Sequence, residues 1–165
     1  MSTWSELQSL NWKVLEITIP NDSMNDQSIT SLNLSRFQRL RKLTIGNECF
    51  MYVNDLSIQG LSMIESIVIG ENSFTKKKNN AGNDPNRHFY LKNCERLREL
   101  RLGHHSFSDY SVCEIENVDR LEVIKMAELN EWSNSFYCAS LELKCDYSVL
   151  VLINRFAQFE ITFVW

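Results

Sequence analysis

The chain has 165 residues, of which 44% are hydrophobic and 23% charged, with a formal net charge of −4. This composition is typical of an ordinary globular domain rather than a disordered segment, and its weakly acidic balance disfavours a nucleic-acid partner, which requires a basic surface. The amino-terminal residues lack the basic end and apolar run of a signal peptide, and the longest apolar run, Val149 to Ile153, is too short to span a bilayer, so we expect no membrane partner.

A short helix is predicted at the amino end, in the segment STWSEL. Ser2 or Thr3 is a suitable N-cap, and Glu6 stands where a carboxylate can bond back to the backbone of the cap. The amphipathic pattern of this helix runs through Leu10. We expect residues 1–11 to cover one end of the domain, because stacked repeats need caps at their ends.

A repeated pattern follows the cap. The stretches VLEITIPNDSM from Val14, LRKLTIGNECF from Leu40, IESIVIGENSF from Ile64 and LRELRLGHHSF from Leu97 each have aliphatic residues at their first, fourth and sixth positions. A weaker fifth copy begins at Leu121. Glycine follows the aliphatic triad in three copies, and a large apolar residue closes four of them: Gly46, Gly70 and Gly103, and Met24, Phe50, Phe74 and Phe107.

The fifth copy departs from this pattern at its closing position. Glu131 stands there, so Trp132 or Phe136 can close the unit only if residues are inserted. A short alternating segment also follows the plug of each unit, and its two apolar residues have the spacing of a strand. These pairs are Leu32 and Leu34, Leu56 and Ile58, Phe89 and Leu91, Cys113 and Ile115, and Leu141 and Leu143. Each unit is therefore predicted to form a strand, a tight turn, a bulky plug and a second short strand.

One interval between units is longer than the others. The five units start 26, 24, 33 and 24 residues apart, and the long interval contains the polar stretch 75–87 with Gly and Pro. This composition predicts an exposed loop inserted into one unit. Lys76, Lys77 and Lys78, with Arg87 at the end of the loop, are expected in solvent, and contact with a phosphate or an acidic partner is the alternative.

The repeated pattern resembles the leucine-rich repeat, L-x-x-L-x-L-x-x-N-x-L, in a 24-residue form with phenylalanine in the last apolar position. The resemblance covers residues 12–146, as about five repeats, and the IG-x-x-S-F element is similar to a variety found in bacterial surface antigens and protist proteins. It implies a single β-rich solenoid over residues 1–165, a right-handed coil with parallel sheets from two short strands per repeat and little helix. Residues 147–165 are then a C-terminal cap or a degenerate sixth repeat.

The chain departs from the family at the asparagine position, where Asp22, Glu48, Asn72 and His105 stand. In the family this side chain turns inward and hydrogen-bonds backbone groups between coils. Only Asn72 matches, so we expect less uniform coils and a histidine, His105, in the inward position of the fourth unit.

Side chains between the buried triad members must point away from the core. They form two columns: Thr18, Thr44, Val68, Arg101 and Lys125, and Glu16, Lys42, Ser66, Glu99 and Val123. The resemblance implies that this face is concave and binds a protein partner, and its varied chemistry suits protein recognition. We therefore expect a non-catalytic interaction module or scaffold with no cofactor, and Arg101 is the residue to test first. A merely solvated sheet is the alternative.

A second outward face is predicted on the return strands, and we expect it to be a weaker binding surface. It exposes Asn33, Ser57, Tyr90, Glu114 and Glu142. A structural fragment of a larger repeat protein is a further alternative to the interaction module, and a clean monomer in solution would count against it. We expect the chain to be a monomer or to associate end to end.

An enzyme or metal site at the turn of His104 and His105, with Ser106 and Asp109, is the alternative from another functional class. Adjacent residues of a turn point in different directions, and neither a G-x-S-x-G elbow nor a C-x-x-C pair is present. We therefore expect no catalytic residues and no metal ligands.

Cysteine usage bears on the compartment. The five cysteines are odd in number, which favours reduced thiols buried as small hydrophobes and a cytoplasmic location. They are Cys49, Cys94, Cys113, Cys138 and Cys145.

Overall fold

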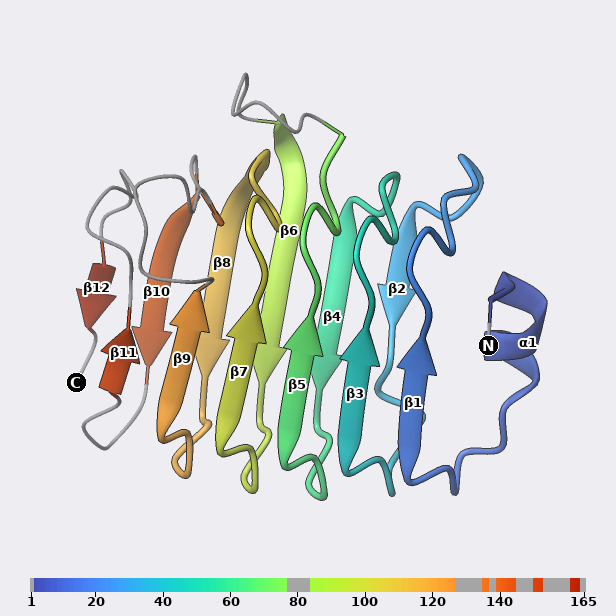
Figure 1. Cartoon of the computed structure of the whole chain (residues 1–165). Coiled ribbons are helices and arrows are strands. Elements are labelled where there is room, and N and C mark those ends of the chain that lie inside the picture. Colours follow the sequence, from blue (N-terminus) through green and yellow to red (C-terminus); the bar gives the residue numbers. More distant parts are fainter. Residues whose placement is uncertain are drawn as a thin grey trace.

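The structure is a computed structural model that describes residues 2–76, 84–126, 135–136, 139–144, 150–152 and 161–163. Within these residues the chain forms a β-solenoid of two parallel sheets (Figure 1). The first sheet has the order β1-β3-β5-β7-β9-β11, and the second has the order β12-β10-β8-β6-β4-β2. Successive strands alternate between the sheets, so each coil contributes one strand to each, as the repeat pattern predicts.

The strand bounds follow the predicted units. The first sheet contains β1 (Glu16–Ile19), β3 (Lys42–Ile45), β5 (Ser66–Ile69), β7 (Glu99–Leu102), β9 (Val123–Met126) and β11 (Leu150–Leu152). The second contains β2 (Ser31–Asn33), β4 (Asp55–Gln59), β6 (Asp84–Lys92), β8 (Tyr110–Glu116), β10 (Ser140–Lys144) and β12 (Ile161–Phe163). β11 and β12 lie in the segment predicted to be a cap or a sixth repeat, and each extends one sheet by a strand.

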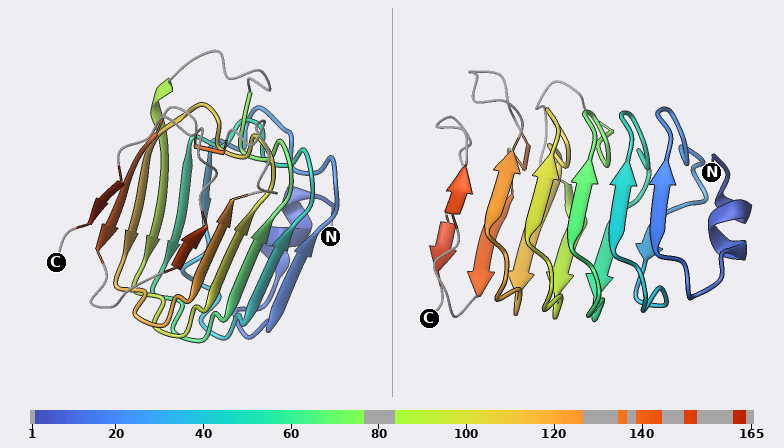
Figure 2. Two further views of the ribbon diagram at one scale, coloured as in Figure 1. Left: turned by 60° about the vertical axis from the view of Figure 1, so that its left-hand side comes forward. Right: turned by 60° about the horizontal axis from the view of Figure 1, so that its bottom comes forward.

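The helix α1 (Trp4–Ser9) lies at the β1 end of the stack, away from the carboxyl end (Figures 1 and 2). Its N-cap is Thr3, whose side chain accepts from the Glu6 N–H while the Glu6 carboxylate accepts from the Thr3 N–H. This reciprocal arrangement is a capping box. It confirms Thr3, rather than Ser2, as the N-cap of the predicted helix. Leu7 is the buried residue of α1 and places the helix over the first coil.

The core lies between the two sheets and is built from the aliphatic triads. Ile17 pairs in register with Leu43, Leu43 with Ile67, and the same row continues into β7 and β9. The alternation is visible in β1, where Glu16 and Thr18 are exposed while the residues that follow each of them are buried. Burying one such aliphatic side chain stabilises the fold by about 1.5–3 kcal/mol. No helix in the described part of the chain is both long and apolar enough for a membrane span.

The plug residues form a continuous aromatic stack. The ring centroids of Phe50 and Phe74 are 5.1 Å apart, those of Phe74 and Phe107 are 4.8 Å apart, and those of Phe107 and Phe136 are 4.7 Å apart. Phe136 therefore takes the plug position of the fifth coil, whereas Trp132 lies outside the described residues. The stack begins at the second coil, because the plug of the first coil is Met24, and phenylalanine at the same place on each following coil produces this geometry.

The prediction that His105 occupies the inward position of its coil is wrong. His105 is half-buried and has φ 55°, and the equivalent residues Asp22, Glu48 and Asn72 have the same left-handed backbone. Asn, Asp and His are the non-glycine residues that enter this region most readily. The position of His105 therefore requires a left-handed backbone conformation. The inward polar side chain belongs to the next residue, which is Ser106 in this coil.

The inward group is a hydroxyl in three described coils. Ser73 Oγ donates to the Gly46 carbonyl at 2.8 Å, and Ser106 and Ser135 repeat the bond one and two coils later, each at 2.7 Å. All three serines are buried, so each bond satisfies a polar group inside the stack. These serines, which we call the serine ladder, make the hydrogen bonds between coils that the resemblance predicts for asparagine.

The long loop begins and ends differently from the prediction. Residues 84–87 belong to β6, with a register shift between Asp84 and His88, and Arg87 is fully buried rather than solvated. Arg87 and four other buried residues form the loop-base cluster: Thr75, Arg87, Ser108, Asp109 and Tyr110. Lys76 is exposed as predicted, and Lys77 and Lys78 lie outside the described residues.

Two of these residues form a buried ion pair. Arg87 Nη1 donates to Asp109 Oδ2 at 2.8 Å, and Arg87 Nη2 donates to the carbonyls of Met51 and Val53. The guanidinium lies 4.7 Å from the centre of the Tyr110 ring, whose hydroxyl also donates to Val53. The carboxylate of Asp109 accepts from the Lys76 N–H as well, so this cluster fixes both sides of the loop.

Candidate functional site

The ten residues predicted for partner binding lie on the outward face of the first sheet. In one column Thr18 pairs with Thr44, Thr44 with Val68, Val68 with Arg101 and Arg101 with Lys125. The other column runs through Glu16, Lys42, Ser66, Glu99 and Val123 in the same way. The structure therefore brings together all ten residues as two continuous columns that cross five strands.

The chemistry of this face changes along the stack. Towards β1 the face carries two threonines with Glu16 and Lys42. Towards β9 it carries two valines among charged residues. Arg101 is 54% exposed, and its Nε donates to Glu99 Oε1 at 2.6 Å within the same strand. This contact leaves the terminal nitrogens of Arg101 available on the surface.

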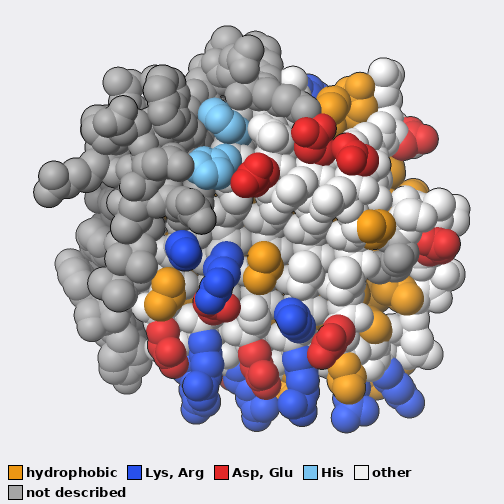
Figure 3. All heavy atoms as spheres, in the orientation of Figure 1, with side chains coloured by type: hydrophobic (Ala, Val, Ile, Leu, Met, Phe, Trp, Pro, Cys, Tyr) orange, Lys and Arg blue, Asp and Glu red, His pale blue; other side chains and the backbone are white. Residues whose placement is uncertain are grey.

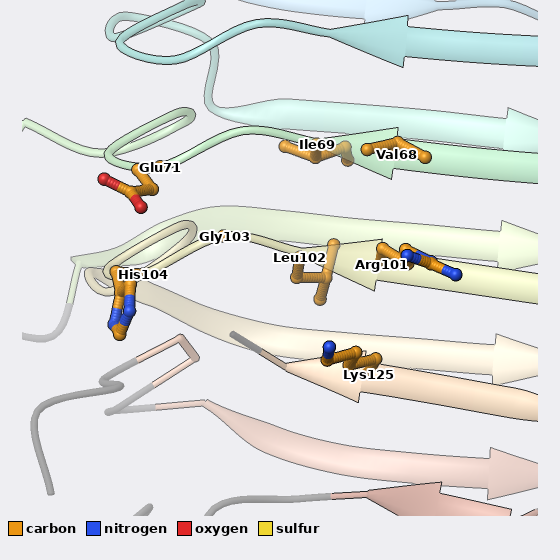
Figure 4. Close-up of a pocket in the computed structure, with 8 residues that line it drawn as sticks. All are labelled: Val68, Ile69, Glu71, Arg101, Leu102, Gly103, His104 and Lys125. Atoms are coloured by element: carbon orange, nitrogen blue, oxygen red, sulfur yellow. The ribbon is translucent and has the colours of Figure 1, made fainter. Parts of the chain in front are cut away.

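A hollow of about 410 Å³ opens at the carboxyl ends of β5, β7 and β9 (Figure 4). We call it the first-sheet hollow, and it is lined by Val68, Ile69, Glu71, Arg101, Leu102, Gly103, His104 and Lys125. In Figure 4 the Lys125 ammonium is directed towards the turn that carries His104, whereas the Arg101 guanidinium points back along its strand. Cationic side chains from two neighbouring strands thus border one open space.

The glycine column explains why the hollow forms here. Gly70 and Gly103 follow the triads of β5 and β7, and a Cβ on Gly103 would lie 2.6 Å from the Gly70 carbonyl carbon and 2.4 Å from the Glu71 nitrogen. No side chain fits between such closely stacked turns. The column is therefore bare, and the side chains before and after it stand as the walls of the hollow.

A second change in sequence opens the same region. In the earlier coils Asn21 and Asn47 form a ladder, because each Oδ1 accepts an N–H from the next coil, on Asn47 and Glu71, at 2.9 Å. Glu71 and His104 occupy the equivalent position in the next two coils. These longer, ionisable side chains end the ladder and line the hollow instead.

The outward face of the second sheet is different, because its charged groups contact one another. Lys92 Nζ lies 2.5 Å from Glu114 Oε2 and 3.2 Å from Glu116 Oε2. The hydrogen bond to Glu114 and, more weakly, the one to Glu116 raise the pKa of Lys92. His88 Nδ1 lies 3.2 Å from Asp55 Oδ1. Tyr90 is half-buried beside Lys92, which lies 5.4 Å from its ring centre.

The residues of the alternative metal or hydrolytic site do not converge. The rings of His104 and His105 are 6.4 Å apart, Ser106 is buried and bonded to Gly70, and Asp109 is held by Arg87. Burial, followed by the neighbouring His104, lowers the pKa of His105. Among the described residues, no group of three or more His, Cys, Asp or Glu side chains is arranged to hold a metal ion.

Sequence reasoning missed two features. The first-sheet hollow was signalled only by glycine at one position in three copies, which indicates a close backbone approach but not an open space beside it. The loop-base cluster had no signal in the repeat, because Arg87 lies in an insertion that occurs once. The sequence pattern places its partner Asp109 only in the alternative enzyme or metal site at the histidine turn.

The comparisons with known proteins add no relative to these observations. The chain matches no protein-family model, and it matches neither a curated protein nor a solved structure.

Proposed function

We propose that this chain is a non-catalytic binding module that presents the outward face of the first sheet to a protein partner. The observation that carries the proposal is the pair of columns, whose ten side chains are held in register on strands with a buried core beneath them. Binding to a rigid face costs little ordering free energy, which favours association. The coils that present the face are proposed to be of the leucine-rich-repeat type, as the 24-residue period and buried triads support.

The chemistry of the face favours a folded protein or peptide over a small repeated ligand. A repeated ligand calls for the same side chain on each coil, whereas Thr18, Val68 and Arg101 differ along one column. Arginine beside half-buried valine is a combination suited to the centre of a protein interface, where Arg is enriched and other charges are depleted. We place the centre of binding at β5, β7 and β9, around the first-sheet hollow.

The test is affinity capture with the wild-type chain, followed by a measured affinity for the captured protein. We expect Arg101→Glu to weaken binding at least tenfold, because it reverses a charge in the centre of the proposed face. Arg39→Glu is the matched control, since it makes the same charge change on an exposed residue outside both columns. A second probe, Val68→Glu, keeps the result decisive if Arg101 is peripheral. Full binding by both face variants would show that the partner binds elsewhere.

We also propose a cytoplasmic location, which the free thiols support. Cys49, Cys94 and Cys113 are buried and unpaired in the described structure. Free buried cysteines are usual in reducing compartments. Fractionation of cells that express the tagged chain tests this, and recovery in an oxidising compartment would contradict it.

A further inference from the structure

The turns that lead from the second sheet back to the first carry charged side chains along one edge of the molecule. Figure 3 shows Lys and Arg side chains gathered at the lower edge in that view. One column on this edge alternates in sign from coil to coil: Arg41, Glu65, Arg98 and Glu122. Backbone hydrogen bonds from Glu65 to Arg41, from Arg98 to Glu65 and from Glu122 to Arg98 set the register of this column.

The alternating column pairs its charges. Arg41 Nη1 lies 3.8 Å from Glu65 Oε1, and Arg98 Nη1 lies 3.8 Å from Glu122 Oε1. Opposite charges on neighbouring strands stabilise each other modestly. This column therefore needs nothing from outside the chain.

The column two residues earlier in each turn does the opposite. It contains Arg39, Met63, Arg96 and Arg120, so Arg96 and Arg120 are like charges on adjacent coils. Both side chains line one hollow, so their like charges lie near each other and repel. Both residues are exposed, and within the described structure neither makes an ion pair or a side-chain hydrogen bond. A repulsion that the adjacent column avoids points to a compensating ligand.

These arginines border an open hollow of about 300 Å³ lined by Glu65, Arg96, Arg98 and Arg120, which we call the arginine hollow. We infer that the arginine hollow binds one phosphate group, free or as a monoester. Arginine presents a planar fork of donors that matches phosphate oxygens, and a dianion between Arg96 and Arg120 turns their repulsion into attraction. Arg98, already near Glu122, supplies a third guanidinium.

The surroundings restrict the ligand to a compact anion. Glu95 and Asp119 are exposed and precede the two arginines directly in sequence, and Glu65 is part of the lining itself. An extended polyanion or an anionic membrane surface would meet these carboxylates as well as the arginines. One phosphate group can contact the guanidinium groups alone.

The test is calorimetric titration of the full chain with inorganic phosphate and with blocked phosphoserine, each compared with chloride at matched ionic strength. We expect saturable binding of phosphate or of phosphoserine that Arg96→Gln and Arg120→Gln each weaken about tenfold, the effect of losing one strong charge-assisted contact. Arg39→Gln is the control, because it occupies the same column beside the uncharged Met63 and should bind as the wild type does. Tighter binding of phosphoserine would identify a monoester as the source, and tighter binding of inorganic phosphate would identify free phosphate.

Three results would overturn the inference. One is an equal response to chloride, and another is an equal loss of binding in Arg39→Gln, because both describe general screening of an arginine-rich edge. The third is binding to vesicles of anionic lipid without binding to phosphate or phosphoserine. Arg96→Lys keeps the charge without the fork of donors, and it should also bind several-fold more weakly. Circular dichroism confirms that each variant is folded, since all of these side chains are on the surface.

Discussion

The interior of the regular coils and the loop-base cluster meet the same requirement in different ways. Both must satisfy polar groups that the stack removes from water. Most regular coils use one serine hydroxyl, as in the bond from Ser106 to Gly70, and the second coil uses the Cys49 thiol, which donates to Pro20. The stacked plug rings fill the rest of the interior. The loop-base cluster uses an ion pair between Arg87 and Asp109 with hydrogen bonds to two neighbouring carbonyls, and it leaves Arg87 Nε and Asp109 Oδ1 without a hydrogen-bond partner among the described residues. A repeat can use the same hydroxyl-to-carbonyl hydrogen bond in many coils. An insertion that occurs once needs its own set of polar partners.

The difference predicts where the molecule is most sensitive to substitution. A serine that loses its hydroxyl disturbs one bond between two coils. Removal of Arg87 or Asp109 leaves the charge of its partner buried and unpaired. Removing one partner of a buried ion pair is much more costly than removing one neutral hydrogen bond.

The largest effect is expected from Asp109→Ala. It leaves the fully buried Arg87 without its carboxylate, and breaking a buried pair in this way costs about 3–5 kcal/mol in the free energy of unfolding. Urea unfolding followed by circular dichroism measures the loss. The double variant Arg87→Met with Asp109→Leu should recover most of it, because no charge is then buried. A double variant no more stable than Asp109→Ala would show that the charges themselves are required.

A smaller loss is expected from Gly70→Asn in the regular coils. A Cβ at Gly70 would lie 2.5 Å from the Gly46 carbonyl carbon, so the coils must move apart, and such overpacking costs about 1–3 kcal/mol. Gly60→Asn is the matched control, because Gly60 has φ +67° and open space around it. Asparagine tolerates the left-handed region, so this control should retain nearly full stability in the same unfolding measurement. Equal losses in the two variants would mean that backbone freedom, not space, explains both glycines.

Ser106→Ala is expected to cost less, about 1 kcal/mol, which is the net value of one hydrogen bond in a protein. It removes the donor to the Gly70 carbonyl in the fourth coil. Ser62→Ala, at an exposed position, is the control and should be neutral. The comparison between serine ladder and ion pair fails if Ser106→Ala is as damaging as Asp109→Ala.

The last effect appears only at alkaline pH and is absent near neutrality. Burial raises the pKa of the Cys94 thiol to about 11, whereas an unfolded thiol titrates near about 8.5. A group whose pKa is raised by folding contributes its full stability below the unfolded pKa and loses it as pH rises towards the folded pKa. The free energy of unfolding should therefore fall above about pH 8.5. Cys94→Ala should flatten this dependence in unfolding curves recorded at several pH values, and an unchanged slope would contradict the assignment.

The repeated part of the fold could be predicted from the sequence because each position is seen several times. The triads that begin at Val14, Leu40 and Ile64 predict the buried residues of their coils, and all of these except the partly buried Val14 are buried. The strand spacing predicts the register that pairs Thr18 with Thr44. The capping box at Thr3 and Glu6 follows from a local rule that needs no tertiary information.

Features that depend on a single event could not be predicted. The burial of Arg87 requires knowing that the inserted loop returns as a strand beside Asp109, and no second copy shows this. The leucine-rich-repeat pattern predicts His105 in the inward position, because it places the inward residue by its number in the repeat. The backbone conformation of the turn places Ser106 there instead. The arginine hollow is an open space between neighbouring coils, and the positions of Arg96 and Arg120 in the repeat do not show that this space exists.

The serine ladder also gives the stack a direction. Three hydroxyls of the ladder, on Ser73, Ser106 and Ser135, each donate to a carbonyl in the preceding coil. A chain made from its amino end therefore completes each acceptor before the matching donor emerges, and α1 already covers the first coil. Shortening the protein from its carboxyl end leaves the remaining hydroxyls satisfied, whereas shortening it from the amino end strands a donor. Growth by adding coils is consequently easier at the carboxyl end.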